Sequence, residues 1–277
     1  MTDLLSFATA LLYAGLGIYF WRTTWLAPKS AEHAAPAVKP GWERSAVLIP
    51  LLLHTGLLYQ SLIASAGSKL GLGATISAIA WATVLIYWLE NFRYKLEGLQ
   101  AFVLPVAAVS VLAPIVLPAS SHTVLHSELL GFKIHLLIAI LAYSLFTIAA
   151  LHAVLMAMVE RRLHGGAASA ILRNLPPLLT MEHLLFRIIT VGFVLLTLTL
   201  ASGMLFSEEL FHQPLQFTHK NLFAIVSWVI FAALLGGRKV YGWRGRTAIR
   251  WIMSGFAVLL LAYIGSKFVL EVILHRT

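Results

Sequence analysis

Histidines inside apolar segments are the first residues of this 277-residue sequence that could do chemistry. Residues 131–155 read GFKIHLLIAILAYSLFTIAALHAVL, which is apolar enough to cross a bilayer yet carries His135 and His152. A polar side chain in a membrane is costly and usually marks a pathway or a cofactor. Two imidazoles that approach iron from opposite sides suit a bis-histidine haem, so these residues are candidate ligands.

The spacing of the histidines predicts two separate levels. His135 and His152 are 17 residues apart, which is about 25 Å along one helix, too far to share one iron. His275, just past the last apolar segment, matches the height of His135 near the outer surface. His54 and His152 both fall about 10–14 Å below the opposite face. We therefore predict an outer pair, His135 with His275, and an inner pair, His54 with His152. The alternative for each is a hydrogen bond to a neighbouring helix.

A second set of histidines lies in the polar connections. The segment SSHTVLHSE contains His122 and His126, and FHQPLQFTHK contains His212 and His219. With nearby glutamates they form a permissive ligand set for zinc or copper. Their spacing matches no specific metal motif, so solvated loop histidines are the alternative.

Composition predicts the elements that position these side chains. The sequence is 60% hydrophobic and 11% charged, whereas a soluble domain is about 25% charged. Apolar runs of about 20 residues recur along the chain, the pattern of an all-α polytopic membrane bundle. We expect one transmembrane domain over residues 1–277. Cysteine is absent, which excludes disulfides, thiolate metal sites and a CxxCH haem attachment.

Eight transmembrane helices are predicted, with both termini outside. They cover about 4–26, 45–67, 72–91, 98–118, 131–159, 184–206, 220–237 and 248–273. Lysine and arginine gather in the odd-numbered connections, above all in GGRKVYGWRGRTAIR, and basic connections stay in the cytoplasm. This distribution accounts for the net charge of +9 through the orientation of the chain in the lipid bilayer, so the charge does not indicate nucleic-acid binding. It predicts a multi-pass protein of the bacterial inner membrane.

The order of several segments resembles a known family. KIHLLIAILAYSLFTIAA, LASGMLF, KNLFAIVSWVIFAALLGGR, GWRG and LLLAYIGSKF follow one another as in the cytochrome c assembly membrane proteins. This superfamily includes CcsA, CcmC and the HemX-like and YpjD-like proteins. The resemblance covers essentially the whole chain, is strongest over residues 131–267, and is greatest to the YpjD/HemX-like branch of eight-span inner-membrane proteins.

The resemblance implies roles for individual residues. In the CcsA branch a histidine at the outer start of the corresponding span is an axial haem ligand, which carries onto His135. A second outer histidine follows the final span and carries onto His275. Lys220 matches the lysine of the family's WDPKE-like run, and Trp228 matches a tryptophan of the next span.

Two departures from the family pattern stand out. The tryptophan and aspartate of the outer-loop run are missing from FTHKNLF, which removes aromatic rings on which haem could stack. An intramembrane histidine expected near the inner end of span seven falls at Gly236 or Gly237.

We therefore expect an inner-membrane protein that binds or relays haem b in cytochrome c biogenesis or haem homeostasis and is not an enzyme. The sequence contains no phosphate loop, GxSxG or HExxH motif. Expected partners are other cytochrome c maturation or haem-synthesis proteins. The alternatives are a HemX-like regulator of tetrapyrrole synthesis, a proton- or metal-linked transporter or accessory subunit, and a structural scaffold.

Overall fold

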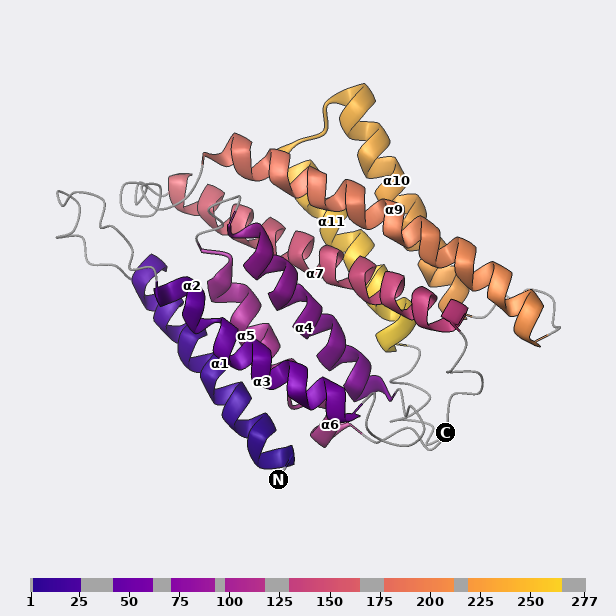
Figure 1. Ribbon diagram of the computed structural model, residues 1–277. Helices are drawn as coiled ribbons and strands as arrows, with labels where there is room; N and C mark the ends of the chain where they lie inside the picture. The colour runs from indigo at the N-terminus through magenta and orange to yellow at the C-terminus, as the bar shows by residue number, and fades with distance from the viewer. Residues whose placement is uncertain are drawn as a thin grey trace.

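A bundle of helices makes up the computed structural model, which describes residues 2–25, 42–61, 71–92, 98–117, 130–164, 177–211 and 219–265. Within these ranges all regular structure is helical (Figure 1). The elements are α1 (Thr2–Trp25), α2 (Trp42–Ala46), α3 (Leu48–Tyr59), α4 (Leu72–Glu90), α5 (Gln100–Ser110), α6 (Ala113–Val116), α7 (Leu130–His164), α9 (Leu178–Phe211), α10 (His219–Tyr241), α11 (Gly245–Leu260) and the π-helical turn η3 (Leu261–Gly265).

The described helices confirm the polytopic all-α prediction. Six are long and apolar enough to cross a membrane: α1, α4, α7, α9, α10 and α11 with its continuation. Two shorter apolar stretches, Leu48–Tyr59 and Gln100–Val116, fall within the second and fourth predicted spans. The fourth is divided, because α5 ends at Ser110 and α6 begins at Ala113 with Pro114 in its first turn, where a missing N–H costs no hydrogen bond.

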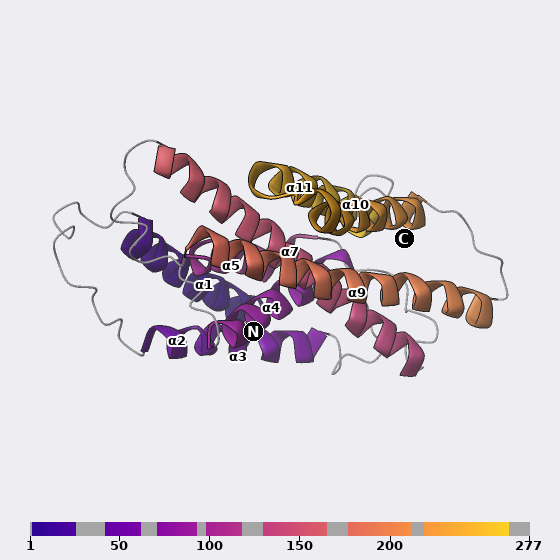
Figure 2. The same cartoon turned by 90° about the horizontal axis from the view of Figure 1, so that it is seen from above.

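Helix α7 lies at the centre of the bundle. It packs against α9, α4, α11 and α5, with α1 to α6 on one side and α10 and α11 on the other (Figures 1 and 2). Helices α7 and α9 are antiparallel, since His135 meets Ser202 near one end and Phe146 lies against Gly192 further along. We call the end where α7 begins and α9 ends the outer end, and the opposite end the inner end. Which end faces the cytoplasm stays a prediction from the basic residues.

Stacked rings hold α10 and α11 onto α7. Phe146 of α7 stacks on Phe231 of α10 with ring centroids 4.0 Å apart, and both are fully buried. Gly255 of α11 leaves the space that the Phe231 ring occupies, because a Cβ there would approach Phe231 Cζ to 2.8 Å. The Ser227 hydroxyl donates to the Gly255 carbonyl oxygen at 2.9 Å. These contacts fix the positions of the helices that carry the outer-end side chains.

Gly73 permits a close backbone approach between α4 and α6 that a side chain would block. A Cβ at this position would lie 2.6 Å from the Ala113 carbonyl oxygen and 2.8 Å from Pro114 Cα. Backbone cannot move aside as a flexible side chain can. We expect Gly73→Ala to destabilise the protein by about 1–3 kcal/mol through overpacking, measured as the free energy of unfolding in mixed micelles. Gly56→Ala is the matched control, because a Cβ there has open space; equal losses in both variants would contradict the packing argument.

Candidate functional site

The outer end of α7 presents His135 to α9. His135 Nδ1 lies 2.8 Å from Ser202 Oγ, and the Ser202 hydroxyl also lies 3.2 Å from the Thr199 carbonyl oxygen, to which it donates. A hydroxyl that donates to a carbonyl can accept from a protonated Nδ1. The arrangement therefore favours the tautomer whose lone pair is on Nε2. Metal-bound histidines are held in this way, with the non-ligating nitrogen donating to a second residue.

A lysine and a tyrosine complete the polar group at this end. Lys220 Nζ lies 5.3 Å from the centroid of the Tyr263 ring, a cation–π contact. The Tyr263 hydroxyl is 3.1 Å from Thr75 Oγ1, which links η3 to α4. We call His135, Ser202, Lys220 and Tyr263 the outer cluster. It gathers side chains of α7, α9, α10 and η3, so it exists only once these four segments have packed.

The π-helical turn next to the outer cluster is tied to α7. The Tyr143 hydroxyl donates to the Leu259 carbonyl oxygen at 3.1 Å, and the Tyr143 and Tyr263 rings meet edge to face at 6.3 Å. Backbone hydrogen bonding changes register at Leu261–Gly265, and π-turns are frequent at functional sites. Sequence reasoning missed Tyr143 and Tyr263, although the run LLLAYIGSKF was singled out.

Trp228, matched to the family by sequence, lies between α9 and α10. Its ring stacks on Phe193 with centroids 5.3 Å apart, and its Nε1 donates to Thr197 Oγ1 at 2.9 Å. It lies eight residues beyond Lys220 on α10, about 12 Å deeper along the helix. Among the described residues, its ring contact and its hydrogen bond join α9 and α10 and involve no member of the outer cluster.

The two inner histidines face different neighbours. His54 is buried, with Nε2 2.8 Å from Ser77 Oγ and Nδ1 3.5 Å from the Tyr13 hydroxyl, so it faces α4 and α1. His152 is buried too, and neither ring nitrogen has a hydrogen-bond partner among the residues that the structure places. The main chain of Met181 on α9 approaches the His152 ring without meeting hydrogen-bond geometry. No hydrogen bond joins His54 to His152 within the described ranges, and their pairing stays a prediction.

The unsatisfied imidazole of His152 has a consequence for stability. A buried polar group without a partner costs about 1–3 kcal/mol, and leucine has a similar volume without that cost. We expect His152→Leu to raise the free energy of unfolding by about 1 kcal/mol, measured in mixed micelles without added ligand. His183→Leu, an exposed position on α9, is the control and is expected to change stability little. A loss of stability in His152→Leu would show that the imidazole has a structural partner.

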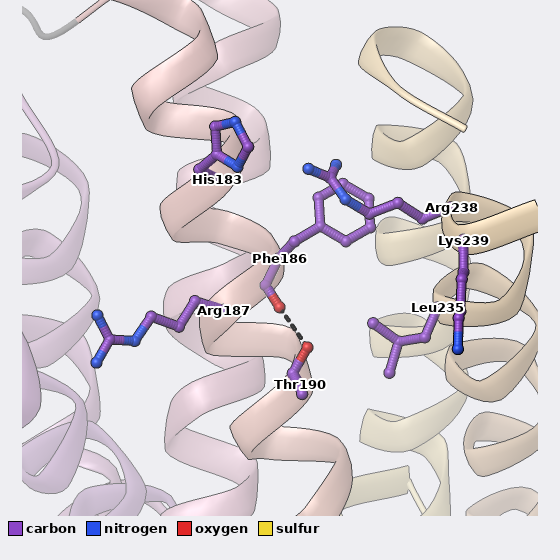
Figure 3. A pocket seen from close by; sticks show the side chains of 7 residues that line it. All are labelled: His183, Phe186, Arg187, Thr190, Leu235, Arg238 and Lys239. Atoms are coloured by element: carbon purple, nitrogen blue, oxygen red, sulfur yellow. Dashed lines mark hydrogen bonds between the residues drawn. The ribbon is translucent and has the colours of Figure 1, made fainter. Parts of the chain in front are cut away.

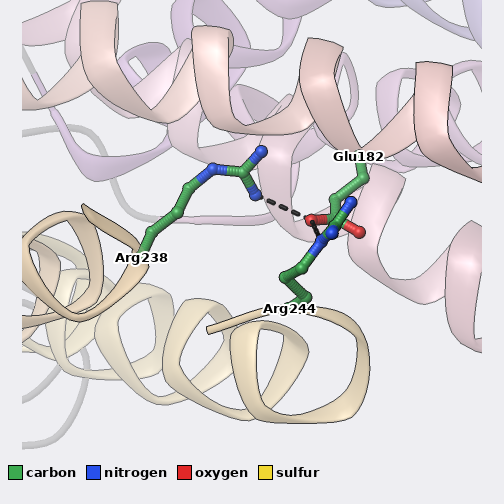
Figure 4. A network of polar contacts seen from close by, with 3 residues as sticks. All are labelled: Glu182, Arg238 and Arg244. Atoms are coloured by element: carbon green, nitrogen blue, oxygen red, sulfur yellow. Dashed lines mark hydrogen bonds and ion pairs between the residues drawn. The ribbon is translucent and has the colours of Figure 1, made fainter. Parts of the chain in front are cut away.

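The inner end contains an ion-pair network that the sequence did not reveal. Glu182 Oε1 accepts hydrogen bonds from Arg238 at 2.7 Å and from Arg244 at 3.1 Å (Figure 4). The Arg238 guanidinium lies over the Phe186 ring, 3.6 Å from its centroid. Such pairing cannot be read from the sequence, because contacts between helices depend on how each helix is rotated about its own axis.

The position where the family pattern has an inner histidine is filled differently here. A methyl group on Gly237 would overlap the Trp243 ring, whereas Gly236 faces open space. Trp243 also stacks on Trp251, with centroids 5.0 Å apart. The Trp243 indole thus occupies the space beside Gly237 and packs against α10 and α11.

Several predicted site residues lie outside the described ranges. These are His275 of the outer pair and His122, His126 and His212 of the metal set; His219 is the first residue of α10. Among the described residues no group of three or more His, Cys, Asp or Glu side chains is arranged to hold a metal ion. The outer-loop metal site stays a prediction.

Comparisons with known proteins agree with the resemblance read from the sequence. The sequence model of the family described as Cytochrome C assembly protein matches residues 42–274. Inner membrane protein YpjD of Escherichia coli (strain K12) is 29% identical over 243 residues, covering 84% of this chain and 89% of that protein. Cytochrome c biogenesis protein CcsA of Prochlorococcus marinus (strain MIT 9301) is 26% identical over 246 residues, covering 80% of each. A 28.8 kDa protein of Azospirillum brasilense is 31% identical over 144 residues, about half of each chain.

Proposed function

This chain belongs to the cytochrome c assembly protein family, and from that premise we propose that it binds haem b at the outer cluster of a multi-pass inner-membrane protein. In this proposal haem binding serves cytochrome c biogenesis or haem homeostasis, and the protein catalyses no covalent chemistry. The relative CcsA carries cytochrome c biogenesis in its name, and the relative YpjD is an inner membrane protein.

The observation that carries the proposal is the hydrogen bond between His135 Nδ1 and Ser202 Oγ at 2.8 Å. It holds the imidazole in the orientation and tautomer that an axial ligand needs. Bound haem would supply an iron that takes axial nitrogens and propionates that take cationic partners. His135 would hold the iron, and Lys220, whose charge also acts on His135, would pair with a propionate.

The remaining ligands of the proposal are assigned from the sequence. His275 is the proposed second axial ligand of the outer site. His54 and His152 are a proposed second, inner pair. Of these two, it is His152 whose buried ring nitrogens have no hydrogen-bond partner among the described residues, which a ligand role would account for. His54 already shares both nitrogens with Ser77 and Tyr13 and would have to exchange one of them.

A visible absorption spectrum of the detergent-purified protein tests this function. We expect a Soret band, either as purified or after titration with haemin, that shifts to longer wavelength on reduction with dithionite. Binding should saturate at one haem, or at two if the inner pair also forms. A colourless protein that takes up no added haem would contradict the proposal.

A further inference from the structure

A pocket between α9 and α10 at the inner end lies away from the outer cluster. It has a volume of about 510 Å³ and is lined by His183, Phe186, Arg187, Thr190, Leu235, Arg238 and Lys239 (Figure 3). We propose that this pocket binds the phosphate head group of an anionic phospholipid. The proposal depends on the membrane setting of the helices and not on haem binding.

The charge of the lining is one-sided. Arg238 and Lys239 contribute two cations, whereas the Arg187 guanidinium points away from α10 (Figure 3), and no carboxylate lines the pocket. The nearby carboxylate, Glu182, bonds to Arg238 and to Arg244, so it offsets no more than one of the surrounding charges. A phosphodiester would therefore enter a site with excess positive charge. Basic pockets between transmembrane helices are sites at which acidic lipid head groups bind.

Arg238 is held in place before any ligand arrives. Its guanidinium lies over the Phe186 ring, 3.6 Å from the centroid, and one of its nitrogens donates to Glu182 at 2.7 Å. A guanidinium has five N–H donors, and among the described residues Glu182 is the only hydrogen-bond partner of the Arg238 side chain. A guanidinium that is already held in one orientation and still has N–H donors to offer is suited to binding phosphate oxygens, because little side-chain entropy is lost on binding.

The shape and position of the pocket favour a lipid over a soluble anion. A volume of about 510 Å³ far exceeds that of a phosphate ion and lies in the range of sites for small organic ligands, about 300–1,000 Å³. Phe186 and Leu235 add apolar surface beside the cations. Thr190 lines the end of the pocket that is nearer the middle of α9 (Figure 3). A glycerol backbone and the start of an acyl chain match this change from charged to apolar lining.

Lipid titration of the full-length protein followed by native mass spectrometry tests the assignment. Phosphatidylglycerol and phosphatidylcholine with identical acyl chains are compared on wild type and on the variant Lys239→Gln, which leaves the Arg238–Glu182 pair intact. Each cation near a lipid phosphate contributes about fivefold in affinity. We therefore expect Lys239→Gln to bind phosphatidylglycerol about fivefold more weakly than wild type does and to bind phosphatidylcholine with unchanged affinity.

Arg250→Gln is the matched control, because it removes one exposed charge that does not line the pocket. It should change phosphatidylglycerol binding less than about twofold. Equal loss in both variants, or equal affinity of wild type for both lipids, would overturn the proposal. Displacement of phosphatidylglycerol by millimolar inorganic phosphate would instead assign the pocket to a soluble anion and overturn the lipid assignment.

Discussion

His135→Ala is expected to lower the affinity for haem by about 100-fold and to remove the Soret band of the purified protein. Removal of a residue that only positions a metal ligand lowers the affinity for the metal by about 10- to 100-fold. Removal of the ligand itself should lower the affinity by at least the larger of these factors. The imidazole is replaced by a methyl group, so no axial nitrogen remains on α7 at this level. Haemin titration followed by absorbance measures the effect.

Two further variants make the His135 result specific. Ser202→Ala removes only the hydrogen bond at 2.8 Å to Nδ1 and should weaken haem binding about tenfold, with a small shift of the Soret maximum. His183→Ala changes an exposed histidine at the other end of α9 and should bind haem as wild type does. If His135→Ala retained the wild-type spectrum and affinity, the outer cluster would not be the haem site.

Glu182→Gln should cause the largest loss of stability among the charged positions, about 2 kcal/mol in the free energy of unfolding. Its carboxylate is buried, with 8% of the residue exposed, and holds two arginines. Breaking a fully buried pair costs about 3–5 kcal/mol, because a charge is left without compensation. We expect a smaller loss of stability for Glu182→Gln, because the Arg238 and Arg244 side chains are 23% and 54% exposed. Unfolding in mixed micelles, followed by circular dichroism, measures the loss.

Glu160→Gln provides the comparison, because Glu160 pairs with Arg246 at 2.8 Å but the two side chains are 26% and 67% exposed. Exposed pairs contribute about 0–1 kcal/mol, so this variant should be close to wild type. High salt should reduce the stability of wild type little, since the Glu182 pairs are partly shielded from solvent. A Glu182→Gln protein as stable as Glu160→Gln would show that the two arginines find water or lipid partners instead.

Much of the bundle could be predicted from the sequence. Eight apolar segments were expected, and each has an apolar helix in the structure, six of them long enough to span a membrane. Bilayer thickness and the need to satisfy backbone hydrogen bonds impose this on any such chain. The interruption between Ser110 and Ala113 was not expected, since a short break in an apolar run leaves its hydropathy unchanged.

Only part of the candidate site could be predicted from the sequence. The height of His135 near the outer surface was predicted by counting residues along a helix, and Ser202 lies in LASGMLF, one of the segments that carry the family resemblance. The bond between them was not foreseen, nor was the contact of Lys220 with Tyr263. The similar depths expected for His54 and His152 stay a prediction, and the contacts of His54 with Tyr13 and Ser77 were not foreseen.

By itself, the sequence determined that this chain is a bundle of apolar helices and which family it resembles. These are properties of one segment at a time, decided by hydrophobicity, length and the rise of 1.5 Å per residue. Only the tertiary structure decided that His135 meets Ser202, that Glu182 binds Arg238 and Arg244, and that His152 is buried without a hydrogen-bond partner among the described residues. Such contacts depend on how each helix is rotated about its own axis against its neighbours, and that rotation is fixed by the packing of side chains from several segments at once.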